Sequence, residues 1–298
     1  MLPHPHRRAV LQGLGATAAV GALGGVAHAT RRRPNVLFIS IDDLNDWVGV
    51  MGGHAQARTP NIDRLMRRGV HFSNAHCAAP ACNPSRTATL TGIRPSTSGV
   101  YSNSQSWRPA LPDALTLPQQ FARNGYETLG AGKIFHFNEA ASWDTYWPSV
   151  CERSPDGPGA DPGPNGRKVG SLAFGESRAR RDGVMSDAHV ADWVSGQLSK
   201  ERDKPFFLGC GFFKPHLPWH VPRRYFEMYP LDQVVLPLVR ADDLDDVPPI
   251  GRRMVHIEHH QAIIAKHAWA EAVQAYLAAL SFADAMVGEV LDALDASP

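Results

Sequence analysis

Pairs of ionisable residues follow three apolar runs of this sequence. The runs are residues 35–41, 127–130 and 205–213, and the polar residues after them are Asp42 and Asp43, Lys133 and His136, and Lys214 and His216. Continuous apolar runs of this kind predict buried parallel strands. Ligands of open α/β sheets bind at the carboxyl ends of strands, so we expect the three pairs to meet in one site.

The residue types of these pairs indicate binding of a cation and an anion. Two adjacent carboxylates repel each other, and a cation relieves that repulsion. Their oxygens are the ligands that calcium or magnesium prefers. Lys133 is suited to bind an anion, and His136 to move a proton near neutral pH. Taken singly, a turn with a helix cap, a surface lysine and a packed histidine would explain the same residues.

A cysteine with unusual neighbours stands between the first two runs. The segment Cys82-Asn83-Pro84-Ser85-Arg86 is followed by Leu-Thr-Gly at residues 90–92. Pro84 and Ser85 suit the start of a helix, whose free N–H groups would face residue 82 and favour an anion such as sulfate. Arg86 lies one turn further on and can hydrogen-bond anion oxygens. A buried or redox-active cysteine is the alternative.

The cysteine segment resembles the signature of type I sulfatases, and the wider sequence resembles their iduronate-2-sulfatase-like branch. The matching segments are residues 41–44, 59–63, 82–92, 132–136, 214–216 and 281–288. This resemblance implies the alkaline-phosphatase-like sulfatase fold, an α/β architecture with a mixed, mostly parallel sheet flanked by helices. It also implies hydrolysis of a sulfate ester, on a substrate such as a sulfated carbohydrate.

The resemblance further implies a chemical role for each matching residue. In this family a maturation enzyme oxidises the cysteine to formylglycine, whose hydrate attacks the sulfur atom. Formylglycine 82, Asp42 and Asp43 would hold calcium. The remaining residues would contact the formylglycine, the sulfate or the leaving group, or handle a proton; they are Arg86, Lys133, His136, Lys214 and His216.

The sequence departs from the family pattern near its C-terminal end. The family supplies two more metal ligands from an Asp-His-Gly segment on a later strand, and residues 34–298 contain no such segment. We therefore expect residues 34–298 to be an incomplete, N-terminal part of the catalytic domain. A phosphonate or phosphate monoester hydrolase of the same superfamily and an inactive, truncated pseudoenzyme are the alternative functions.

Four further segments carry structural predictions. Thr59 as N-cap, Pro60 in the first turn and Gly69 as the end define a helix. Apolar residues recur at helical spacing over residues 269–294, which predicts a long helix. Residues 154–166 are rich in Pro and Gly and predict a surface loop. We interpret the histidines of residues 256–260 as a solvated face rather than a metal cluster.

The N-terminus and the composition indicate where the protein acts. Residues 6–12 resemble a twin-arginine export motif, and Ala27-His28-Ala29 resembles a cleavage site. Residues 1–29 are therefore predicted to be a signal peptide that directs export to the bacterial periplasm or the medium. The stretch is too poor in large apolar residues for a stable membrane anchor. A net charge of +1 indicates no nucleic-acid partner.

Overall fold

A computed structural model describes residues 33–147, 165–170, 172–177, 182–240, 242–255 and 257–298. All helices and strands described here lie within the unit formed by residues 35–298. The predicted signal peptide, most of the predicted loop at 154–166, and His256 lie outside the described residues.

A four-stranded parallel sheet forms the centre of the fold. Its strands, in spatial order, are β1 (Val36–Ile41), β6 (Phe206–Phe212), β2 (Glu127–Gly132) and β3 (Thr145–Trp147). Every neighbouring pair runs parallel. Each residue of β6 is buried, as expected for a strand with neighbours on both edges and helices on both faces. The predicted α/β class and the three predicted strands are confirmed.

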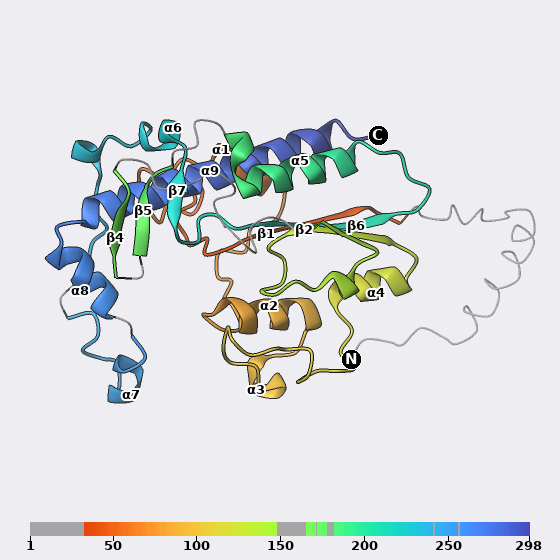
Figure 1. Ribbon diagram of the computed structural model, residues 1–298, viewed down its shortest axis with the longest axis horizontal. Coiled ribbons are helices and arrows are strands. Elements are labelled where there is room, and N and C mark those ends of the chain that lie inside the picture. Colours follow the sequence, from red (N-terminus) through yellow and green to blue (C-terminus); the bar gives the residue numbers. More distant parts are fainter. Residues whose placement is uncertain (1–32, 148–164, 171, 178–181, 241, 256) are drawn as a thin grey trace, which may run out of the picture. The chain divides into compact units, whose positions relative to one another are not determined.

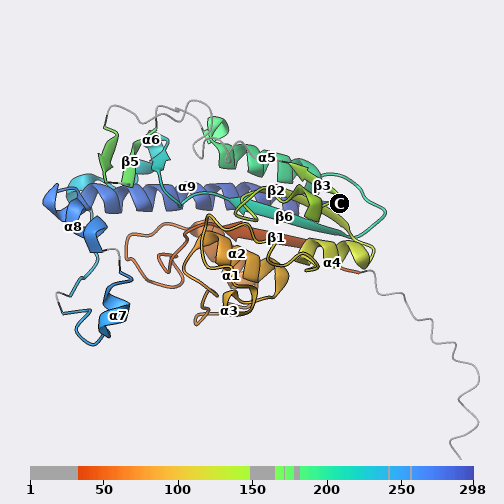
Figure 2. The ribbon, with the colours of Figure 1, turned by 60° about the horizontal axis from the view of Figure 1, so that its bottom comes forward.

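Helices cover both faces of this sheet (Figures 1 and 2). On one face lie α5 (Ser186–Leu198) and α9 (Trp269–Asp295), which pack with the sheet into the larger apolar core. On the other face lie α2 (Cys82–Thr91) and α4 (Leu117–Arg123), which enclose a smaller aromatic core. The long helix predicted from apolar spacing is confirmed, and it is buried along most of its length.

Glycines in the two central strands make room for a tryptophan. A Cβ atom on Gly130 would lie 2.8 Å from the Trp143 ring, and one on Gly209 would lie 2.5 Å from it. These distances are shorter than van der Waals contact, so larger residues would displace the ring. The glycines therefore set how closely Trp143 approaches the sheet.

The helix predicted after Thr59 is confirmed, with Thr59 at the N-cap position, but the Thr59 side chain does not form the capping hydrogen bond. Helix α1 spans Pro60–Arg68, and Thr59 stands at the N-cap position without accepting a hydrogen bond from the helix. Its hydroxyl instead donates to Asp63 Oδ1 at 3.1 Å. Asp284 of α9 caps the helix, accepting the N–H of Ile62 at 2.8 Å. A residue more than two hundred positions away thus replaces the local cap.

The remaining elements are a second sheet and several short helices and turns. The second sheet contains β4 (Arg167–Val169), β5 (Leu172–Glu176) and β7 (Trp219–Val221), in that order. The short helices are α3 (Pro95–Ser98), α6 (Arg223–Phe226), α7 (Pro249–Arg252) and α8 (Ile257–Ala265), with 3-10 turns at Ala140–Ser142, Asp182–Val184 and Leu231–Gln233. Within the described ranges, no helix is both long and apolar enough to cross a bilayer.

Candidate active site

The carboxyl ends of β1, β6 and β2 lie side by side, and the segments that follow them form the candidate site. The backbone continues the sheet pairing for one residue past the strands. The Asp42 N–H donates to the Phe212 carbonyl at 3.1 Å, and the Lys133 N–H donates to the Gly211 carbonyl at 2.8 Å. Parallel pairing therefore places residues far apart in sequence at one edge of the sheet.

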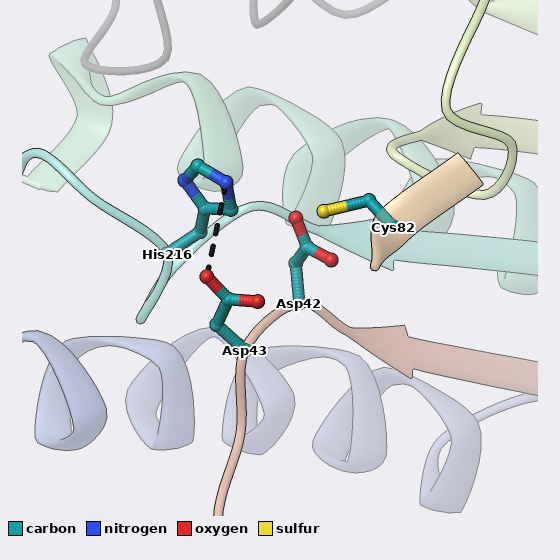
Figure 3. Close-up of side chains that lie close together, drawn as sticks. All are labelled: Asp42, Asp43, Cys82 and His216. Atoms are coloured by element: carbon teal, nitrogen blue, oxygen red, sulfur yellow. Dashed lines mark ion pairs between the residues drawn. The ribbon is translucent and has the colours of Figure 1, made fainter. Parts of the chain in front are cut away.

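Four side chains at this edge present atoms that could bind one metal ion. Asp42, Asp43, Cys82 and His216 each offer a ligand atom, and these atoms lie within 4.8 Å of one another (Figure 3). Calcium binds oxygen at 2.3–2.6 Å, so two ligands of one ion lie at most about 5 Å apart. The spacing and the two carboxylates fit calcium. The sulfur of Cys82 does not, but an aldehyde or hydrate oxygen at residue 82 would.

Asp42 is buried between two cations. Its Oδ1 accepts from Arg86 Nη2 at 2.7 Å, and its Oδ2 forms an ion pair with Lys133 Nζ. Burial by itself would raise the pKa of Asp42, but the charges and hydrogen bonds of Arg86 and Lys133 outweigh it and lower the pKa. Asp42 is therefore held as a carboxylate, and its oxygens keep further lone pairs for a metal ion.

Asp43 has a backbone conformation that is rare outside glycine. Its φ angle is +56°, in the left-handed region, where aspartate is among the better tolerated residues. The Tyr276 hydroxyl donates to the Asp43 carbonyl at 2.9 Å and accepts the Asn45 N–H at 3.2 Å. The Asp43 carboxylate lies 3.7 Å from Nε2 of His216. Tyr276 of α9 thus holds the turn that presents Asp43 to the site.

Cys82 is the first residue of α2, as the position of Pro84 suggested. The next residue, Asn83, is buried and donates to the carbonyls of Ser102 at 2.8 Å and Gln105 at 2.7 Å. Cys82 lines a cavity of about 530 Å³ together with Asp42 and Asp43. Burial, followed by the charge of Asp42, raises the pKa of the Cys82 thiol, which disfavours a free thiolate nucleophile.

Arg86 braces the site. Besides its bond to Asp42, its Nη1 donates to the Ile134 carbonyl at 2.8 Å and to Ser40 Oγ at 3.2 Å, and it also reaches the Lys133 carbonyl. These bonds join α2 to the ends of β1 and β2. Arg86 also lines the cavity beside Cys82, so its position is compatible with the predicted contact to an anion.

His136 and Lys214 occupy different surroundings. His136 is half-buried, and burial, followed by the charge of Lys133, lowers its pKa and favours the neutral imidazole. Lys214 is fully buried, and its ammonium group donates to the Pro218 carbonyl. Its side chain therefore points into the protein in this structure, whereas a direct substrate contact requires it to face the cavity. A direct contact between Lys214 and the substrate therefore remains a prediction.

Two residues that support the site were not predicted from the sequence. Asp187, in the first turn of α5, accepts the N–H groups of Phe213 and Lys214, both at 2.8 Å, and so fixes the segment that carries His216. Tyr276 holds Asp43 as described above. The acidic residue at a helix start was visible in the sequence, but its partners depend on how α5 packs beside β6.

The fold and the site together define an α/β protein with a group of side chains that could hold a metal ion at the carboxyl edge of its sheet. The family model described as "Sulfatase" matches residues 34–298. The chain belongs to the sulfatase family.

Relatives of known name agree with this assignment. The chain is 37% identical over 293 residues to a "Sulfatase" of Formosa agariphila, covering 89% of this chain and 56% of the relative. It is 30% identical over 291 residues to the "Iduronate 2-sulfatase" of Mus musculus, covering 88% of this chain and 51% of the relative. The chain thus spans about half the length of these relatives, which are named as sulfuric ester hydrolases.

Solved structures confirm the fold. A "2-O GAG sulfatase" superposes with a TM-score of 0.64 at 23% identity, covering 90% of this chain and 55% of that one. A phosphonate monoester hydrolase of Agrobacterium radiobacter gives a TM-score of 0.64 at 20% identity, covering 89% and 60%. The predicted alkaline-phosphatase-like fold of sulfatases, with a mostly parallel sheet between helices, is confirmed.

Proposed function

We propose that the protein carrying this chain hydrolyses sulfate esters of carbohydrates, with formylglycine at position 82 and calcium beside it. The observation that supports this most is the joint placement of Asp42, Asp43, Cys82 and His216 within 4.8 Å. A raised thiol pKa at Cys82 disfavours the unmodified cysteine as nucleophile, whereas conversion to formylglycine supplies an oxygen at the same position.

The charges of the site suit a sulfate ester. A bound calcium ion would withdraw electron density from the sulfuryl oxygens. Lys133 and Arg86 add positive charge next to residue 82. Fixed positive groups of this kind stabilise the negative charge that develops during hydrolysis. The start of α2 adds little, because the Asn83 N–H donates to Asn103 Oδ1 at 2.9 Å, Pro84 has no N–H, and the Ser85 N–H donates to the Ala81 carbonyl at 3.0 Å.

His136 is the proposed proton-handling group, and His216 is a proposed substrate contact. Because its pKa is lowered, His136 is mainly the neutral imidazole near pH 7, which is the form that can accept a proton. His216 stands beside Asp43, on the side of the site opposite Cys82 (Figure 3). We propose that His216 contacts the sulfate or the leaving alcohol.

Export through the twin-arginine pathway completes the proposal. That pathway carries folded chains, so a maturation enzyme would act on Cys82 before export. The protein would then meet its sulfated substrate in the periplasm or the medium. The residues proposed as the signal, 1–29, precede the family match, which begins at residue 34.

Peptide mass spectrometry and kinetics test this function. In protein coexpressed with a maturation enzyme, the peptide containing residue 82 should lose one sulfur and two hydrogens and gain one oxygen. The matured protein should turn over an aryl sulfate faster than an aryl phosphonate, and Cys82→Ala should abolish turnover. Cys77→Ala is the matched control, because Cys77 lines the same cavity and is exposed. An unmodified thiol, or preference for the phosphonate, would contradict the proposal.

A further inference from the structure

A second cavity, of about 340 Å³, lies on the other side of the Asp43 turn. Its lining combines aromatic and aliphatic side chains. The aromatic ones are Trp47, Trp219, Trp269 and Tyr276, and His259 and His260 of α8 add two imidazoles. Helix α8 and strand β7 both lie beside the first part of α9, where these residues come together (Figures 1 and 2). The volume falls in the range of small-molecule sites, about 300–1,000 Å³.

The aromatic rings of the cavity form two groups. Tyr276 contacts Trp47 at 5.3 Å and Trp219 at 5.5 Å between ring centroids, both edge to face. Trp269, nearer the start of α9, contacts the His260 ring of α8 at 5.3 Å. Trp47, Trp219 and Trp269 are each partly exposed. Aromatic rings that are partly exposed offer flat, apolar faces to a ligand.

The same two segments build this cavity and the candidate active site. Asn45 and Trp47 line the cavity, two and four residues after Asp43. Trp219 follows His216 by three residues, and its indole N–H donates to the Pro215 carbonyl at 2.7 Å. A residue spans at most about 3.6 Å of chain, so Asn45 lies within about 7 Å of Asp43. The two cavities are therefore close neighbours.

The polar groups of the cavity select among ligands. The described lining residues include two imidazoles and the amide of Asn45, and no carboxylate. Imidazoles exchange hydrogen bonds with hydroxyl groups and, when protonated, attract a carboxylate. A sugar ring combines apolar C–H faces with a rim of hydroxyl groups, and a uronic acid adds a carboxylate. Aromatic faces with imidazoles at one side complement such a ring.

We propose that this aromatic cavity is a binding subsite for an unsulfated sugar of the substrate, a uronate-containing oligosaccharide. Because the protein is proposed to act on a sulfated carbohydrate, the subsite extends that function from the sulfate group to the sugars beyond it. The sulfated sugar occupies the cavity at Cys82, and a neighbouring sugar lies against the rings of Trp219, Tyr276 and Trp269.

Binding of an unsulfated heparosan tetrasaccharide to the matured protein, measured by calorimetry, tests the subsite without relying on catalysis. His260→Ala and Trp269→Leu should each weaken binding about tenfold, the change expected from one lost contact of ordinary strength. Gln261→Ala is the matched control, because Gln261 is exposed on the same helix and does not line the cavity. His260 is exposed as well, so its loss should leave the fold intact.

Kinetics separate the subsite from the proposed function. If both hold, the two variants lose efficiency on a sulfated tetrasaccharide but keep aryl sulfate turnover within about twofold of the parent. If aryl sulfate is not hydrolysed while the tetrasaccharide binds and both variants weaken it, the subsite stands and the function fails. No binding to the parent protein, or equal weakening by Gln261→Ala, would overturn the subsite.

Discussion

Removing the Tyr276 hydroxyl should weaken calcium binding without removing any proposed ligand. The substitution Tyr276→Phe keeps the ring and its contacts with Trp47 and Trp219, so only two hydrogen bonds of the phenol are lost. These bonds join α9 to the carbonyl of Asp43 and the N–H of Asn45, at 2.9 Å and 3.2 Å.

The size of the effect follows from these two bonds. A hydrogen bond contributes about 0.5–1.5 kcal/mol net, so the pair contributes ~1–3 kcal/mol. Asn45 is exposed, so water replaces part of its hydrogen bond in the variant. The expected loss of stabilising free energy at the Asp43 turn is therefore about 1–1.5 kcal/mol. Holding a non-glycine residue in the left-handed region costs a similar ~1–2 kcal/mol, so Asp43 would leave this conformation more often. A loss of about 1.4 kcal/mol corresponds to a tenfold weaker calcium affinity.

Calcium titration by calorimetry, together with thermal unfolding, measures this effect in the matured protein. Tyr229→Phe is the matched control: its hydroxyl pairs with Ser281 at 2.6 Å, in a buried position away from Asp43. The control should lose stability and keep its calcium affinity. The reasoning fails if Tyr276→Phe binds calcium as tightly as the parent, or if Tyr229→Phe loses as much affinity.

Four further predictions concern the site, the sheet and two of the helices. His136→Ala in the matured protein should lower kcat for an aryl sulfate about 10²–10⁴-fold, and a near-parental rate would remove His136 from the mechanism. Gly211→Ala should lower the free energy of unfolding by about 1–3 kcal/mol in denaturant titrations, because its Cβ would lie 2.3 Å from the Lys133 carbonyl carbon. Gly196→Ala, in the open on α5, should instead gain about 0.5–1 kcal/mol. Burial raises the pKa of Asp284, so its contribution to the free energy of unfolding falls as pH rises above about 4. Asp284→Asn should therefore make the free energy of unfolding depend less steeply on pH. An unchanged pH dependence would exclude Asp284 as its source.

The sequence by itself determined the class of the fold and the edge of the sheet where the site lies. Apolar runs at β1 and β6 have the length and composition of buried strands, and this pattern is local. The rule that parallel strands present ligand-binding residues at their carboxyl ends predicts that Asp42, Asp43 and His216 lie together, as they do in the structure. The long helix α9 followed from its apolar spacing in the same way.

Only the tertiary structure decided how the residues at that edge are held. Thr59 had the residue type of a cap, yet Asp284 caps α1, because α9 packs beside that helix. Tyr276 reaches Asp43 across more than two hundred residues of sequence. Lys214 has the residue type of an anion contact, yet its ammonium group points to the Pro218 carbonyl. The spacing of apolar residues in a sequence indicates which positions of a helix or strand are buried. The contacts described here depend instead on which distant elements pack against each other.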